Sequence, residues 1–86
     1  MTDFSTRIGI ENSHSAPRIV VVEPWARDYT LFPGEELAII ARGDVAAPWF
    51  NIVEWDDTTQ VYCEDTVDVK VMQDDRELEC GHQRQA

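Results

Sequence analysis

The apolar residues of this chain are mostly branched at Cβ, since its 86 residues include nine Val and six Ile but only three Leu. Such side chains lose rotamer freedom in a helix and pack well on a pleated sheet. Their spacing indicates the same structure. In residues 66–72 Val alternates with polar side chains, and residues 19–22 form an uninterrupted apolar run, typical of a central strand covered on both faces. The sequence therefore predicts an all-β protein.

Residues 35–42 are the segment that also suits a helix, because they combine Glu, Leu and Ala. They are bounded by Pro33-Gly34 and Gly43-Asp44, and a segment this short is more typical of a strand. We therefore expect a strand here, and we expect the type II turn favoured by Pro33-Gly34 to round a corner between two sheets. The predicted strands cover residues 7–11, 18–23, 28–32, 35–42, 49–55, 60–64, 66–72 and 76–80.

Seven or eight short, mostly antiparallel strands favour a single-domain small β-sandwich over residues 1–86, with a small barrel as the alternative. The last three predicted strands follow one another through short acidic turns, so we expect them to form a C-terminal meander. Residues 1–5 and 81–86 are expected to be frayed, since the ends of a domain are poorly ordered unless they pair or dock.

The acidic residues outnumber the basic ones by 17 to 7, which gives a formal net charge of -10. Nucleic-acid binding needs clustered Lys and Arg, and an anionic membrane repels such a chain, so neither nucleic acid nor membrane is an expected partner. The excess is uneven, because residues 54–79 alone carry a net charge of -8. We expect the meander to be a negative surface that steers basic partners.

Several short motifs occur in order along the chain: Glu23-Pro24-Trp25, Pro33-Gly34-Glu35, Trp55-Asp56-Asp57, and Cys80-Gly81-His82-Gln83-Arg84. In these motifs the chain resembles a family of small uncharacterised bacterial proteins. The resemblance covers most of the chain and implies a compact β fold. It carries over no catalytic or binding residue.

The longest apolar run is five residues, Leu37 to Ala41, which is too short for a membrane span or the core of a signal peptide. We therefore expect a soluble, cytoplasmic protein whose two cysteines are reduced thiols. Cys63, Cys80 and His82, with His14, are nevertheless the residue types of a metal site. A small metal-binding protein using Cys63, Cys80 and His82 is therefore the alternative function.

Spacing argues against that site, because a meander places Cys63 and Cys80 on next-nearest strands, about 9.6 Å apart. Both a disulfide and a shared ion then require the strands to switch sheets. Buried, inert thiols are the main expectation, and no cofactor is expected. The acidic pairs at 56–57, 64–65 and 74–75 lack the pattern of a calcium loop and suit solvated turns.

Catalysis is not expected. Ser13, His14 and Ser15 are adjacent in sequence, whereas a nucleophile, its base and an orienting group must converge from separate positions. The four glycines are too scattered for a phosphate-binding loop. We therefore predict that the protein is not an enzyme.

The sequence best supports a non-catalytic protein-interaction or structural module. Trp is enriched at interface hot spots, and the tryptophans lie at strand ends: Trp25 and Trp49 each follow a proline, and Trp55 ends a strand beside an acidic turn. The predicted interaction surface consists of Trp25, Trp55, Asp56, Asp57, Asp74 and Asp75. We expect an unknown and basic protein partner; pairing of edge strands in a homo-oligomer is a further possibility, and mimicry of DNA a weaker one.

Overall fold

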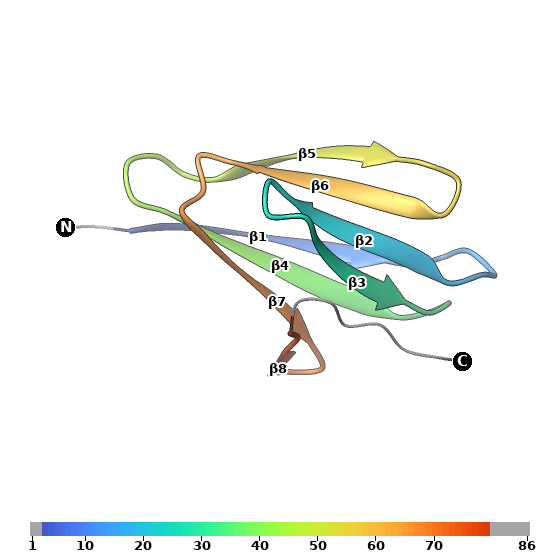
Figure 1. The fold of residues 1–86 in the computed structure, drawn as a ribbon. Coiled ribbons are helices and arrows are strands. Elements are labelled where there is room, and N and C mark those ends of the chain that lie inside the picture. The colour runs from blue at the N-terminus through green and yellow to red at the C-terminus, as the bar shows by residue number, and fades with distance from the viewer. Residues whose placement is uncertain (1–2, 80–86) are drawn as a thin grey trace.

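The computed structural model describes residues 3–79, which form a sandwich of two four-stranded sheets (Figure 1). The strands are β1 (Phe4–Glu11), β2 (Arg18–Glu23), β3 (Arg27–Leu31), β4 (Glu36–Gly43), β5 (Trp49–Glu54), β6 (Thr58–Glu64), β7 (Asp68–Gln73) and β8 (Arg76–Glu77). The predicted all-β sandwich is confirmed, and the two sheets do not close into a barrel. Within the described range there is no helix of the length and apolarity that a membrane crossing needs.

One sheet has the order β1-β4-β7-β8 and the other the order β3-β2-β6-β5. All pairings are antiparallel except β2 with β6, which run parallel. The predicted C-terminal meander is wrong, because β6 and β7 belong to different sheets. Alternation of apolar residues defines a strand and its two faces, but a strand leaving a turn can pair with either sheet, and that choice depends on contacts far away in sequence.

Residues 35–42 form a strand, as predicted, and β4 is central in its sheet. β1 begins at Phe4 rather than at residue 7, and Phe4 and Ser5 pair with Gly43 and Arg42. The expectation that residues 4 and 5 are frayed is therefore wrong, because β4 pairs with β1 as far as Gly43, the last residue of β4. β8 covers only Arg76–Glu77; the end of the predicted strand at residue 80, like the expected fraying of residues 81–86, lies outside the described residues.

The core lies between the sheets and is made mainly by β2, β4, β6 and β7, the two central strands of each sheet. β3 adds Tyr29 and Leu31, which are each 1% exposed. The remaining buried members of the core are Val20, Val22, Leu37, Ile39, Val61, Cys63, Val69 and Val71. Central strands can bury a full face, whereas edge strands have a neighbour on one side only.

Asn12 holds together the end of the sandwich at which β1 passes to β2. Its side chain is fully buried, and its Nδ2 donates to the carbonyls of Ala16 and Leu31, both at 2.9 Å. Its Oδ1 accepts from the backbone N–H of His14 at 2.9 Å, and its own backbone pairs with Gly34 and Glu35 at the Pro-Gly corner. A buried amide with all these partners fixes the corner that the sequence predicted.

Candidate functional site

β5 is the strand in which the burial of the side chains agrees least with an apolar sequence. Its residues are Trp-Phe-Asn-Ile-Val-Glu, yet only Phe50 is half-buried and the rest are exposed. Trp49 is 50% exposed, Ile52 44% and Val53 40%, and Trp55 directly after the strand is 61% exposed. These large exposed apolar side chains are grouped along one edge strand and are not scattered singly over the surface. We therefore take β5 as the candidate site.

The backbone of β5 has one free side, because β5 pairs only with β6 among residues 3–79. The backbone N–H of Trp55 donates to the carbonyl of Thr58 at 2.7 Å, which makes 55 and 58 a hydrogen-bonded pair. Antiparallel ladders alternate, so residues 49, 51 and 53 face β6 in the same way. The N–H and C=O groups of Phe50, Ile52 and Glu54 therefore point toward the free edge.

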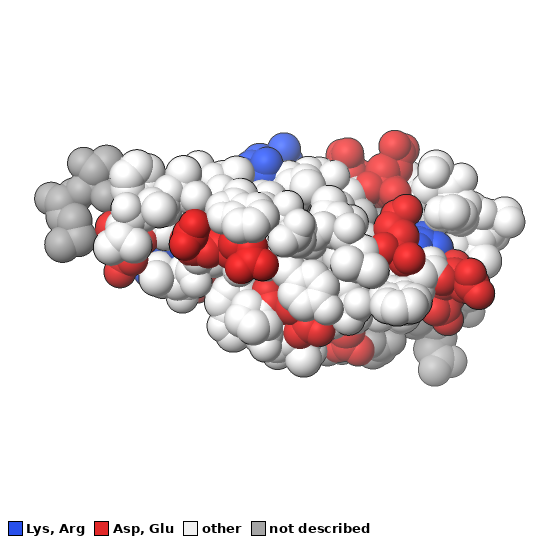
Figure 2. Space-filling model, turned by 90° about the horizontal axis from the view of Figure 1, so that it is seen from above, with Lys and Arg blue, Asp and Glu red and all other residues white. Residues whose placement is uncertain are grey.

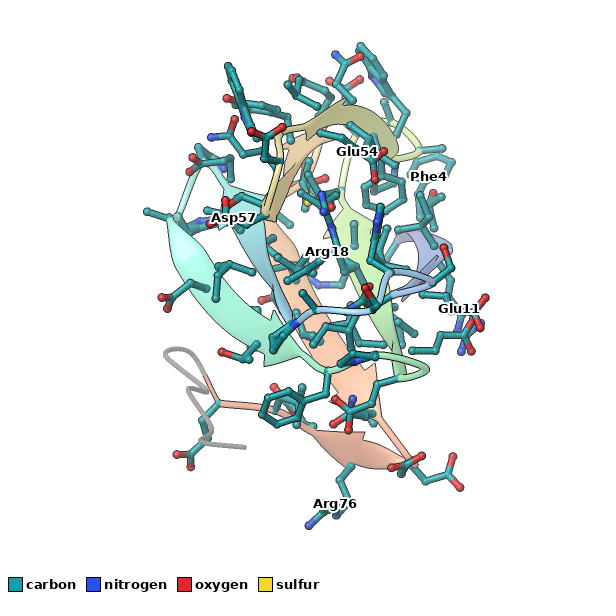
Figure 3. All side chains as sticks on the ribbon, turned by 90° about the vertical axis from the view of Figure 1, so that its right-hand side faces the viewer. Phe4, Glu11, Arg18, Glu54, Asp57 and Arg76 are labelled. Atoms are coloured by element: carbon teal, nitrogen blue, oxygen red, sulfur yellow. The ribbon has the colours of Figure 1, made fainter. Side chains whose placement is uncertain are left out.

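The side chains of the same three residues face the space between the two sheets, since Phe50 is opposite the buried Cys63 and Ile52 is opposite the buried Val61. β1 lies on this side of the sandwich in the other sheet (Figure 1), and its Phe4 remains 39% exposed. In the end-on view of Figure 3, Glu54 and Phe4 lie toward the same side of the molecule. The inner faces of β5 and β1 are thus only partly covered along this side.

The outer face of β5 carries the two tryptophans, and each indole is held by one hydrogen bond. Trp49 Nε1 donates to Asp65 Oδ2 at 3.0 Å, and Trp55 Nε1 donates to Gln60 Oε1 at 2.7 Å. Both rings are therefore oriented while much of their surface stays exposed. Aromatic rings held in this way lose little conformational entropy when a partner covers them.

Arg18, which sequence reasoning did not single out, anchors the turn that follows β5. It is only 6% exposed, and its Nη1 donates to the carbonyl of Asp56 at 2.8 Å. Its Nη2 donates to the carbonyls of Trp55 at 2.9 Å and Thr58 at 3.2 Å and to Thr59 Oγ1 at 3.3 Å. The guanidinium of β2 thereby fixes the end of β5 across the intervening β6 (Figure 3).

The charged side chains around β5 are mostly acidic, although the buried guanidinium of Arg18 lies at the end of the strand. The sequence contains no Lys or Arg between Gly43 and Val69. Figure 2, which looks down on the β5 side, shows acidic side chains spread among uncharged ones, near the middle of this face as well as toward its ends, and few basic side chains. A negative field of this kind attracts basic groups and repels a second acidic surface.

The structure separates the residues of the predicted interaction surface. Trp55, Asp56 and Asp57 are exposed at the end of β5, whereas Trp25 follows the opposite end of β2 and is partly packed against the core. The Arg27 guanidinium also covers the Trp25 ring, 5.6 Å from its centroid.

Asp74 and Asp75 form the β7–β8 turn of the other sheet. Figure 3 shows Arg76, the next residue, on the side of the molecule opposite Asp57. The two acidic residues border an open hollow of about 730 Å³ on the outer face of that sheet, together with Arg7, Glu35 and Glu36. They therefore do not adjoin the tryptophans.

Of the metal candidates, Cys63 is buried in the core, as predicted, and burial together with Glu64 raises the pKa of its thiol to about 11. Residues 3–79 contain no cluster of three or more His, Cys, Asp or Glu side chains that could hold a metal ion. Cys80 and His82 lie outside the described residues, so the metal site stays a prediction. His14 is exposed in the β1–β2 loop, where its backbone N–H donates to Asn12 Oδ1.

The interaction surface predicted from the sequence does not include Trp49 or Ile52. Apolar side chains occur on both alternating sets of β5, and this pattern is typical of a central strand covered on both faces. The available signal was the absence of Lys and Arg from the stretch of sequence that contains the strand. That signal indicates a surface but does not show which edge is free.

Comparisons with known proteins give no further guide, because the chain matches no family model, no curated protein and no solved structure. The resemblance to small bacterial proteins therefore stays a prediction.

Proposed function

We propose that the protein is a non-catalytic interaction module that binds another protein by adding a strand of that protein to the free edge of β5. The observation that carries this proposal is the exposure of β5, an apolar strand whose outward-pointing backbone groups have no partner strand within residues 3–79. In strand addition, main-chain hydrogen bonds provide affinity and side-chain contacts provide specificity.

Three features of the site support this proposal. The backbone groups of Phe50, Ile52 and Glu54 offer the donors and acceptors of a new ladder. The inward side of an added strand would cover Ile52, and its outward side would contact Trp49 and Trp55, whose indoles are already oriented. Long apolar edges are normally protected by charge, proline or a covering segment, and β5 has only Glu54 within it.

The test is selection of binding peptides from a library of random extended sequences, followed by mapping of the bound peptide through backbone amide chemical shifts. Selected peptides are expected to shift the amides of residues 49–55 more than those elsewhere. Ile52→Pro removes an outward N–H that β6 does not use, so it is expected to weaken binding at least about tenfold while the β5–β6 ladder remains.

Ser5→Pro is the matched control, because it places proline on the edge strand β1 of the same open side. It is expected to leave peptide affinity unchanged, which distinguishes addition to β5 from addition to β1. Peptides that bind Ile52→Pro as tightly as the unaltered protein, or whose shifts map to another surface, would overturn the proposal. Circular dichroism of both variants establishes that each retains its fold.

The expected cytoplasmic location belongs to the same proposal. A buried thiol at Cys63 is consistent with a reducing compartment, because a core cysteine needs no disulfide to be stable. Fractionation of the source cell with antibody detection tests this location, and recovery of the protein outside the cytoplasm would contradict it.

A further inference from the structure

We infer that the β5 edge takes a particular class of partner: an extended segment that is apolar in its middle and carries Lys or Arg at both ends. This inference rests on the proposed function and adds the chemistry of the bound strand. It follows from the way charge and apolar surface are distributed along β5.

Acidic side chains gather at the two ends of β5. At its start, Trp49 is opposite Glu64 and its indole donates to Asp65. At its other end are Glu54, the last residue of the strand, and Asp56 and Asp57 in the following turn. All of these lie in the stretch from Gly43 to Val69 that has no Lys or Arg.

The middle of β5 is uncharged. Ile52 faces the space between the sheets and Val53 faces outward, and both are at least 40% exposed. A strand of this length spans roughly 20 Å at about 3.3 Å per residue, which exceeds the screening length of about 8 Å at physiological salt. The two acidic ends therefore act as separate sites, with an apolar section between them.

A bound segment with matching chemistry makes favourable contacts with both acidic ends and with the apolar middle of β5. Apolar residues at its centre cover Ile52 on the inner side and Val53 on the outer side. Basic residues at its ends meet the carboxylates, and an Arg guanidinium can also lie over the exposed ring of Trp49 or Trp55. The intramolecular contact of Arg27 with Trp25 at 5.6 Å is an example of this geometry within the same sheet.

A second copy of this chain fits the edge poorly. Antiparallel pairing of β5 with β5 of another copy brings the start of one strand against the end of the other. Glu64 and Asp65 of one copy would then approach Glu54, Asp56 and Asp57 of its partner, at both ends of the pair. Like charges across an interface oppose association, and the net charge of -10 on each chain adds to this repulsion.

The experiment measures binding of three synthetic peptides to the full chain by calorimetry and by amide shifts. The first has the sequence Lys-Arg-Val-Thr-Val-Thr-Val-Arg-Lys with blocked ends. The second replaces every Lys and Arg by Glu, and the third keeps the composition of the first but places the four basic residues in the centre. The first is expected to bind at the β5 edge at least about tenfold more tightly than either of the others, with affinity that falls as salt increases.

Charge variants test the ends directly. A triple variant with Glu54→Gln, Asp56→Asn and Asp57→Asn is expected to weaken binding of the first peptide about tenfold and to reduce its salt dependence. The matched control is Asp74→Asn with Asp75→Asn, which removes charge from the β7–β8 turn, where Asn also tolerates the positive φ of both positions. That control is expected to leave the affinity unchanged.

The outcomes separate the two proposals. If the acidic or rearranged peptide binds β5 as tightly as the first, the inference about partner chemistry is overturned and strand addition stands. If none of the peptides shifts the amides of residues 49–55, strand addition itself fails. A stable dimer through β5 in sedimentation experiments, lost in Ile52→Pro, would overturn the inference in favour of a second copy.

Discussion

β2 and β5 belong to the same sheet and have similar apolar character, but their surroundings are opposite. β2 lies between β3 and β6, and its side chains alternate between buried and half-buried. β5 lies at the edge, and its side chains are exposed except for Phe50. The inward side chains of β2 meet the other sheet, whereas those of β5 lie along the partly covered side next to β1.

The difference shows that apolar character alone does not place a strand in the core. A strand is buried when it has a neighbouring strand on each side and a second sheet packed against its face. β5 has only β6 beside it, and it faces the edge of the opposite sheet. β2 thus contributes to the core, whereas β5 leaves much of its apolar surface exposed. Four predictions examine this division between the two strands, beginning with the largest effect.

Truncation of a core isoleucine compared with the β5 isoleucine tests the division most strongly. Ile39 in β4 is 0% exposed and Ile52 is 44% exposed. Ile39→Ala is expected to lower the free energy of unfolding by about 3 kcal/mol, through lost burial and a cavity, and Ile52→Ala by less than about 1 kcal/mol. Urea unfolding of both variants measures the difference. Equal losses would show that β5 contributes to the core as much as the central strands do.

Cys63, on β6 between the two strands, provides a pH test. Its folded pKa of about 11 lies above the value of 9.0 for an unperturbed thiol. The unfolded chain therefore loses this proton first, and the stabilisation is complete below pH 9 and is lost as pH rises through 11. Its size is roughly 2 to 3 kcal/mol.

Unfolding at several pH values between 8 and 11 measures this loss. Cys63→Ala removes the thiol, so its stability is expected to fall less steeply over that range than that of the unaltered chain. Parallel slopes for the two proteins would show that Cys63 is not buried beside β5 and β2 as described.

Arg18 tests the link between the two strands, because this β2 residue holds the turn after β5. Arg18→Met leaves the carbonyls of Trp55, Asp56 and Thr58 without their shared donor and is expected to cost about 2 kcal/mol. Arg42→Met is the control, since Arg42 is exposed and its pairs with Asp3 and Asp68 are 3.5 and 3.8 Å long. Such surface pairs contribute less than about 1 kcal/mol.

Thermal unfolding and the NMR signal of the Trp55 indole N–H report on both arginine variants. We expect the Trp55 environment to change in Arg18→Met and to stay the same in Arg42→Met. Equal stability of the two variants would mean that β2 does not hold the end of β5.

The smallest effect concerns the turn at the far end of β2. Ala26 adopts a φ of 54°, which is unfavourable for a residue with a Cβ. Ala26→Gly is expected to raise the free energy of unfolding by about 0.5 kcal/mol, since relief of strain is partly offset by the greater freedom of the unfolded chain. Calorimetric unfolding measures the change. A loss of stability would indicate that the alanine methyl makes packing contacts that outweigh the strain.

Much of the fold was predictable from the sequence because alternation is a local property. The run of apolar residues at 19–22 correctly identified a central strand, and Pro33-Gly34 correctly marked a corner between sheets. The ambiguous segment 35–42 was correctly assigned because its flanking turns limit its length. Strand ends were less accurate, since Phe4 and Ser5 are ordered through β4, which lies far away in the sequence.

The candidate site was only partly predictable. Trp55, Asp56 and Asp57 were identified because aromatic and acidic residues adjoin at a strand end. Trp49 and Ile52 were not included, since nothing local distinguishes a central strand from an apolar edge strand. Asp74 and Asp75 were grouped with them because a meander was expected, and the crossing from β6 to the other sheet separates them.

The sequence by itself determined that the chain forms strands, where most of them lie, and that it carries a large negative charge concentrated after residue 53. These properties depend on side-chain branching, on alternation and on composition, all of which are local. Only the tertiary structure decided which strands flank β2, that β5 is an edge, and that acidic residues flank an exposed apolar strand. Strand order depends on long-range pairing, in which each strand has two faces and two sides available, and side-chain pattern specifies the faces but not the neighbours.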